Sequence, residues 1–245
     1  LAVAAHQDPL SVTREFQPDV VAYSVITGSQ RFYLDLNRRL KAENPALFAA
    51  FGGPHPTFFP EMLQEEGVDG ICRGEGEQPL VDSVDSLSTG NLDTLLGVEN
   101  WSFRCDGQTI VNPVRPYVED LDSLPFPDRD LIYQRDPMAA RSKIKHFLAG
   151  RGCPYNCTYC FNHALSEIYQ GKGRRYRQRS VDHLIDEVRW VKGRYPLEFV
   201  VFVDDTFVLS TRWLAEFGEK YPREIGLPFF CNTRANLVTA EQVRL

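Results

Sequence analysis

The chain has 245 residues, of which 43% are hydrophobic and 24% are charged, and its formal net charge at pH 7 is −6. At about 100–200 residues per domain, this length suggests one or two domains of an ordinary globular protein with a buried core. No apolar run approaches the roughly 20 residues that cross a bilayer, and the start has no basic and apolar signal region. We therefore expect a cytoplasmic protein without a membrane span.

In chain order, the first 90 residues alternate short apolar runs with amphipathic ones. Apolar runs at residues 1–5, 20–25, 46–51 and 68–72 predict buried parallel strands. One helix is predicted after Asp8, which caps it, with Pro9 in the first turn and Pro18 at the end of the segment. Further helices are predicted at residues 31–43, 60–66 and 79–87. Four successive strand–helix units predict an α/β fold with a parallel sheet and right-handed crossovers.

Residues 91–140 break this alternation and predict a connecting region. Residues 100–112 have the pattern of a β-hairpin, with Asp106-Gly107 at the turn. Residues 113–137 contain five prolines, which predict a partly extended connector that runs over a surface.

Strand–helix alternation resumes over residues 141–245. Strands are predicted at residues 145–149, 199–203 and 227–231, and helices at about 181–193, capped by Ser180, and 211–220. The three strands end in a cysteine loop, in Asp204-Asp205 and in Asn232-Thr-Arg234. Because the carboxyl ends of parallel strands lie at one edge, we expect these three sets of residues to converge.

Positive charge is concentrated around the cysteine loop. Residues 141–180 contain nine Lys or Arg and one acidic residue, Glu167, a local charge of +8 that leaves −14 for the remainder. Such stretches are usually solvated faces, but the cysteines within this one favour an anion-binding region. The basic segment around Tyr176 could also contact RNA, yet no separate RNA-binding domain is visible, so we do not expect a nucleic-acid partner.

The cysteine loop has the spacing Cys153-x3-Cys157-x2-Cys160. Three thiolates on one short loop can bind three irons of a 4Fe-4S cluster and leave the fourth iron open to another ligand. The alternative is a structural zinc site completed by His163, but such sites normally form freestanding loops with four closed ligands. A cytosolic setting argues against disulfides.

This motif, placed after the first strand of an α/β barrel, resembles the radical S-adenosylmethionine (SAM) superfamily. The resemblance implies that the open iron binds the amino and carboxylate groups of SAM, whose reductive cleavage yields a 5′-deoxyadenosyl radical. It also implies which residues contact SAM. The backbone of Tyr159 would contact the adenine, and Asp204 or Asp205 would bind the amino group. Asn232 and Arg234 would contact the ribose or the carboxylate. The acidic pair replaces the Gly-Gly-Glu that is usual in the superfamily.

The N-terminal residues resemble the cobalamin-binding domain that precedes many radical SAM barrels, which is a flavodoxin-like (Rossmann-like) sheet. The resemblance rests on segments 18–24, 27–28, 51–57 and 73–77, and extends through segments 124–128 and 176–180. It implies cobalamin contacts at Ser24, Thr27, Gly28, Gly52, Gly53, Gly74, Glu75 and Gly76. Glycine at 52 and 53 would let the backbone approach the cofactor closely. No Asp-x-His-x-x-Gly occurs, and His55 is interpreted as structural.

Together these resemblances predict three parts: a cobalamin-binding domain at residues 1–90 that lacks its first strand–helix unit, a hairpin and linker at 91–140, and the N-terminal part of a radical SAM barrel at 141–245. They imply an enzyme that methylates an unactivated carbon of a small-molecule or peptide substrate, with oxidative cyclisation as another outcome. Such an enzyme needs an external one-electron reductant such as flavodoxin or ferredoxin. The alternatives are a tRNA methylthiotransferase-like enzyme without functional cobalamin binding, and a non-catalytic iron–sulfur or zinc module.

Overall fold

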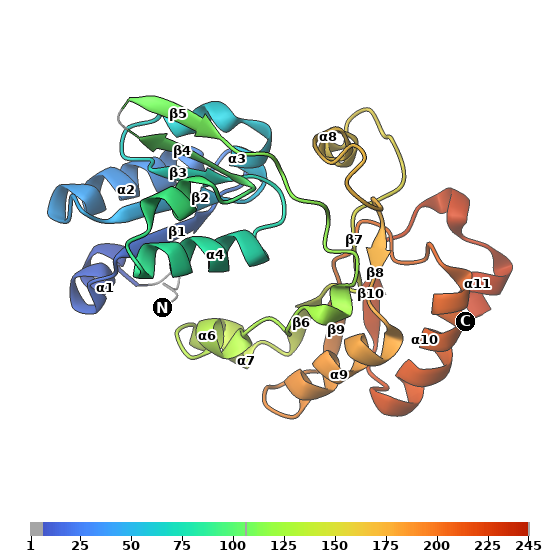
Figure 1. Cartoon of the computed structure of the whole chain (residues 1–245). Coiled ribbons are helices and arrows are strands. Elements are labelled where there is room, and N and C mark those ends of the chain that lie inside the picture. Colours follow the sequence, from blue (N-terminus) through green and yellow to red (C-terminus); the bar gives the residue numbers. More distant parts are fainter. Residues whose placement is uncertain (1–6, 106, 245) are drawn as a thin grey trace. The chain divides into compact units, whose positions relative to one another are not determined.

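The computed structural model describes residues 7–105 and 107–244 (Figure 1). The chain divides into two compact units, and each is described by itself. The first unit consists of residues 8–117 and 159–173, and the second mainly of residues 118–158 and 174–244. The strand predicted at residues 1–5 lies outside the described residues. No helix in the described part of the chain combines the length and apolarity needed to cross a membrane.

The first unit is built on a five-stranded sheet in the order β1-β2-β3-β4-β5. Its strands are β1 (Val20–Ser24), β2 (Phe48–Gly52), β3 (Gly70–Cys72), β4 (Trp101–Cys105) and β5 (Gln108–Val111). Its helices are α1 (Pro9–Phe16), α2 (Gln30–Glu43), α3 (Pro54–Phe58), η1 (Pro60–Gln64), α4 (Glu77–Ser88), α5 (Leu92–Leu96) and α8 (Phe161–Ile168). The parallel pairing of β1, β2 and β3 is as predicted. The helix predicted at residues 60–66 is a 3-10 helix, η1.

The predicted hairpin forms as β4 and β5, but it joins the sheet instead of standing apart. Strand β4 pairs antiparallel with β3, with Gly70 opposite Phe103, so the sheet is mixed and not parallel throughout. The rings of Trp101 and Phe103 stack at 5.6 Å, and a Cβ atom at Gly70 would lie 3.0 Å from the Phe103 ring. Glycine at this position therefore lets two large rings cover the backbone of β3.

The second unit contains a parallel three-stranded sheet in the order β10-β9-β6 and a short antiparallel pair, β7 with β8. The strands are β6 (Ile144–Phe147), β7 (Gly150–Arg151), β8 (Arg177–Gln178), β9 (Phe199–Phe202) and β10 (Phe229–Cys231). The helices are η2 (Leu121–Ser123), α6 (Arg129–Tyr133), α7 (Pro137–Arg141), α9 (Val181–Lys192), α10 (Thr211–Glu224), η3 (Ala235–Leu237) and α11 (Ala240–Arg244). The proline-rich connector thus carries short helices that the sequence did not predict.

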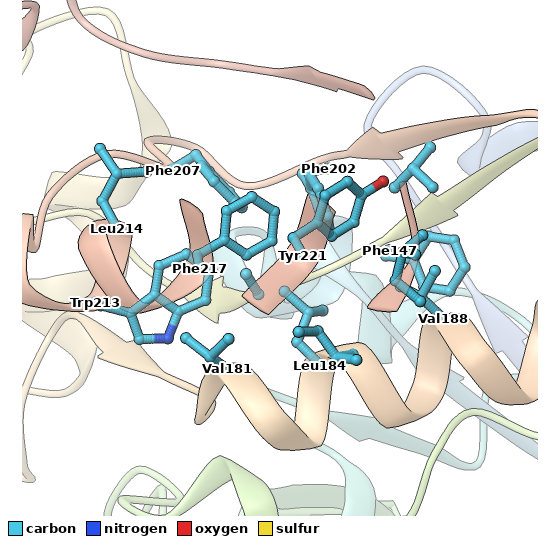
Figure 2. Close-up of a cluster of buried hydrophobic side chains, with 14 of the residues drawn as sticks. Phe147, Val181, Leu184, Val188, Phe202, Phe207, Trp213, Leu214, Phe217 and Tyr221 are labelled. Atoms are coloured by element: carbon cyan, nitrogen blue, oxygen red, sulfur yellow. The ribbon is translucent and has the colours of Figure 1, made fainter. Parts of the chain in front are cut away.

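The core of the second unit lies between this sheet and helices α9 and α10. Figure 2 shows Val181, Leu184 and Val188 on α9 directed toward a cluster of aromatic rings that includes Phe202 and Phe217. The N–H of His183 is bonded to the Ser180 hydroxyl at 3.1 Å, which confirms the predicted cap of α9. The side chains of β6 alternate between buried and exposed, so this sheet is covered on one face only.

Candidate functional site

The residues that follow β6, β9 and β10 meet at one edge of the three-stranded sheet. Strand β9 lies between the other two, and Phe207, in the loop after it, donates its N–H to the carbonyl oxygen of Asn232 at 2.9 Å. The Asn232 side-chain amide donates in turn to the carbonyl oxygen of Asp204 at 3.2 Å. The loops after β9 and β10 are therefore held together, in agreement with the convergence expected from the strand order.

Asp204 connects this edge to the start of the cysteine loop. Its carboxylate accepts the N–H of Ala149 at 3.0 Å and the N–H of Gly150 at 2.5 Å, and the residue is 3% exposed. Burial raises the pKa of Asp204 to about 6, although the two backbone N–H groups act in the opposite direction. Asp205, by contrast, is exposed. Both oxygens of Asp204 thus bind backbone groups, whereas the carboxylate of Asp205 lies at the surface.

The cysteine loop begins at a position that only glycine can occupy. Gly152 has φ of 78°, and a Cβ atom there would lie 2.0 Å from the carbonyl oxygen of Arg175. Farther along the loop, the Cys153 sulfur lies 3.9 Å from the Thr206 hydroxyl, and Arg234 Nη1 lies 3.1 Å from the Cys157 sulfur. Two of the three predicted cluster ligands therefore contact residues that follow β9 and β10.

The boundary between the compact units falls inside the motif, between Thr158 and Tyr159, so Cys153 and Cys157 belong to the second unit and Cys160 to the first. Cys160 is the N-cap residue of α8, where its carbonyl oxygen is 2.5 Å from His163 Nδ1. Tyr159 is 91% exposed. Across the described residues, no three Cys, His, Asp or Glu side chains lie close enough together to hold a metal ion. His163 thus contacts the backbone of Cys160 through its Nδ1 atom.

The residues nevertheless fit an iron–sulfur cluster by their chemistry. All three cysteines are free and partly exposed, so their thiols are available to bind metal as thiolates. In the second unit, the hydroxyl of Tyr176 is buried and has no hydrogen-bond partner among the described residues. Burial, and then the charges of Asp204 and Cys153, raise the pKa of this phenol, which keeps its proton available. A buried donor without a partner is expected where a bound group completes the hydrogen bonding.

The predicted cobalamin contacts lie at the carboxyl ends of β1, β2 and β3. Gly53 has φ of 93°, and a Cβ atom there would lie 2.8 Å from the Val25 nitrogen and 3.2 Å from the Ser24 hydroxyl. Ser24, Thr27 and Gly28 are exposed, and Gly52 is half-buried. The structure therefore brings the Ser24 and Gly52-Gly53 segments together, with Thr27 and Gly28 in the turn that follows. The backbone here is held so closely that only glycine fits at position 53.

His55 packs within the same edge of the sheet. It is 9% exposed, its ring stacks on Phe59 at 5.0 Å, and its Nδ1 atom lies 3.2 Å from the Thr27 hydroxyl. These contacts agree with the structural interpretation of this histidine.

The Gly74-Glu75-Gly76 loop is closed by residues that sequence reasoning missed. The Thr57 hydroxyl donates to the Gly53 carbonyl oxygen at 2.8 Å and accepts the Gly74 N–H at 3.0 Å. The Glu75 N–H donates to the Tyr169 hydroxyl at 2.7 Å, and a Cβ atom at Gly74 would lie 2.0 Å from that same oxygen. Tyr169 follows α8, so its role is a tertiary contact with no local sequence signal. Thr57 lies in a segment that carried the resemblance.

Comparison with protein families identifies both parts of the chain. A B12 binding domain model matches residues 2–84, and a model of the radical SAM superfamily matches residues 147–245. The solved structure of the radical SAM methyltransferase TsrM from Kitasatospora setae superposes with a TM-score of 0.65 at 17% identity, over 88% of this chain and 44% of that one. At this identity the likeness concerns the fold.

Several relatives are similar along most of this chain. An uncharacterized methyltransferase of Pyrococcus horikoshii is 29% identical over 232 residues, which are 94% of this chain and 49% of that protein. The anaerobic magnesium-protoporphyrin IX monomethyl ester cyclase of Rubrivivax gelatinosus is 28% identical, over 92% of this chain and 40% of that protein. The cobalamin-dependent radical SAM methyltransferase TokK of Streptomyces tokunonensis is 24% identical, over 80% of this chain and 28% of that protein. The chain spans half or less of the length of these relatives. It therefore carries a B12-binding domain followed by a radical SAM domain, and proteins similar to it are named as methyltransferases and cyclases.

Proposed function

We propose that this chain forms the cobalamin-binding part and the cluster-binding part of a radical SAM methyltransferase. The observation that carries the proposal is the cysteine loop. Its three free thiols follow β6, the first strand of the parallel three-stranded sheet, in a chain that matches both a B12 binding domain and the radical SAM superfamily. When bound, the cluster and SAM supply a 5′-deoxyadenosyl radical, and cobalamin carries the methyl group. The substrate is a small molecule or a peptide, and a one-electron donor such as flavodoxin or ferredoxin reduces the cluster.

In this proposal the chain's own residues have separate tasks. Cys153, Cys157 and Cys160 bind three irons, and Asp204 fixes the backbone from which their loop starts. Asp205, which is exposed, binds the SAM amino group, since both oxygens of Asp204 already accept backbone N–H groups.

The remaining proposed contacts follow the resemblance. Tyr159 contacts the adenine of SAM through its backbone, and Asn232 and Arg234 contact its ribose or carboxylate. Ser24, Thr27, Gly28 and the glycine segments 52–53 and 74–76 line the cobalamin site together with Glu75.

Two other outcomes compete with methylation of a carbon centre. Similarity to a protein named as a cyclase supports oxidative ring formation as one outcome, which would use the same radical without net methyl transfer. A tRNA methylthiotransferase would need no cobalamin, and the match of residues 2–84 to a B12 binding domain counts against it.

The test is SAM cleavage by a full-length protein that contains this chain. The protein is reconstituted anaerobically with iron, sulfide and cobalamin, reduced with dithionite and supplied with SAM, and 5′-deoxyadenosine is quantified. We expect product from the native protein and from a Cys105→Ala control, and none from Cys157→Ala. Absence of 5′-deoxyadenosine from native protein that contains the cluster would refute the proposed function.

A further inference from the structure

Arg234 makes three contacts that fix its guanidinium beside the cysteine loop. Its Nη1 atom lies 3.1 Å from the Cys157 sulfur, and its Nε atom lies 3.1 Å from the side-chain oxygen of Asn236. Its guanidinium carbon lies 3.8 Å from the centroid of the Tyr155 ring, in a cation–π contact. Tyr155 is two residues before Cys157, so one planar group touches the loop at both positions.

This arrangement orients one N–H of a permanent cation toward a thiol sulfur. Arginine keeps its charge at every accessible pH, and its planar shape directs its donors at fixed angles. Hydrogen bonds to the ligand sulfurs, together with local charge, set the reduction potential of an iron–sulfur cluster. A positive donor favours the reduced cluster, because reduction adds negative charge that the donor stabilises.

We propose that Arg234 is a positioning residue for the cluster. It holds Cys157 through the cysteine sulfur and raises the cluster's reduction potential. This inference rests on the proposed function, since it requires that Cys157 binds iron. It differs from the SAM contact that the resemblance implies for the same residue. A cluster-tuning arginine acts before SAM is bound, whereas a SAM contact has no effect until SAM is present.

The experiment measures the midpoint potential of the reconstituted cluster in the absence of SAM, by redox titration followed by electron paramagnetic resonance. Arg234→Met removes the charge and the donor while it keeps a long side chain. At a fixed solution potential we expect the ratio of reduced to oxidised cluster to fall about tenfold, which is about 59 mV for a one-electron couple. Arg234→Lys keeps the charge without the planar donor, so its midpoint potential is expected to lie between those of Arg234→Met and the native protein. Arg212→Met, which removes an exposed arginine of α10, is the matched control and should leave the potential unchanged.

The outcomes separate this inference from the proposed function. If native protein binds no cluster or fails to cleave SAM, the proposed function is wrong. If native protein does both, but Arg234→Met with native iron content keeps the native potential, the tuning role is wrong. Loss of the SAM-induced change in the resonance spectrum, with an unchanged potential, would leave Arg234 with the proposed SAM contact alone and overturn the tuning role. Should Arg234→Met bind less iron, Arg234→Gln with native iron content decides, because it removes the charge while it keeps a side-chain donor, and a native potential there would overturn the inference.

Discussion

The carboxylate of Asp204 accepts the N–H of Gly150 at 2.5 Å, and this bond ties the end of β9 to the residue that begins β7. Three positions after Gly150 comes Cys153, the first predicted cluster ligand. The buried acid therefore sets the direction in which the cysteine loop leaves the sheet.

Replacing Asp204 with alanine should destabilise the second unit and reduce iron binding. The change leaves two buried N–H groups without acceptors, at about 1–3 kcal/mol for each such group. Unfolding in urea and iron content per chain measure the two effects. Asp205→Ala is the control, since a substitution at an exposed site changes stability by about 0.5 kcal/mol or less. Equal stability of the two variants would contradict the anchoring role.

Asp204 also gives a pH dependence whose sign follows from its pKa. The pKa is raised to about 6 in the folded protein, against about 3.9 in an unfolded chain. The folded protein therefore binds more protons between these values, so the contribution of Asp204 to stability is complete below about pH 4 and is lost as pH rises through about 6. The difference in unfolding free energy between native protein and Asp204→Asn should fall by about 2–3 kcal/mol from pH 4 to pH 7. A constant difference over this range would show that the acid does not titrate as stated.

Glu187 is expected to be a large contributor to the stability of the second unit. Its two carboxylate oxygens lie 2.7 Å from Arg129 Nη2 and 2.5 Å from Arg179 Nη1, and its side chain is 2% exposed. Glu187→Ala would leave the buried Arg179 and the largely buried Arg129 without this anion, at a cost of about 3–5 kcal/mol. Glu198→Ala, which breaks an exposed pair with Lys143, should cost about 0–1 kcal/mol. Chemical denaturation of the two variants makes the comparison, and similar midpoints would contradict the prediction.

Gly53→Ala should impair cobalamin binding more than it impairs folding elsewhere in the first unit. The new Cβ atom would lie 2.8 Å from the Val25 nitrogen, so the end of β1 must move away from the end of β2. Gly90→Ala provides a matched control, because Gly90 also has a positive φ, of 67°, but no atom within 4 Å of the added Cβ. Both variants carry a backbone penalty of about 1–2 kcal/mol. Cobalamin titration by absorbance should show weaker binding for Gly53→Ala alone, and equal affinities would argue against a cofactor role for this segment.

The sequence predicted elements best where the signals were local. Asp8 and Ser180 cap the helices they precede, and the parallel strands of both units lie within about two residues of their predicted ranges. The meeting of Asp204 and Asn232 followed from strand order alone, because parallel strands place their carboxyl ends together.

Contacts between distant segments left no such signal. Tyr169 bonds to the Glu75 backbone 94 residues away, and Arg234 reaches Cys157 across 77 residues. The hairpin pattern of β4 and β5 specified a turn and two strands but not the strand to which they would pair. The pairing of β4 with β3 accompanies the fit of Phe103 and Trp101 over Gly70, which is a tertiary contact.

We propose that one chain binds an iron–sulfur cluster through its cysteine loop and cobalamin through its first sheet. The most direct measurement is the iron and cobalamin content of the anaerobically reconstituted protein, compared between the native chain, Cys157→Ala and Gly53→Ala. We expect ~4 irons and ~1 cobalamin per native chain, loss of iron but not cobalamin in Cys157→Ala, and loss of cobalamin but not iron in Gly53→Ala. Native iron content in Cys157→Ala, or no cobalamin in the native chain, would contradict it.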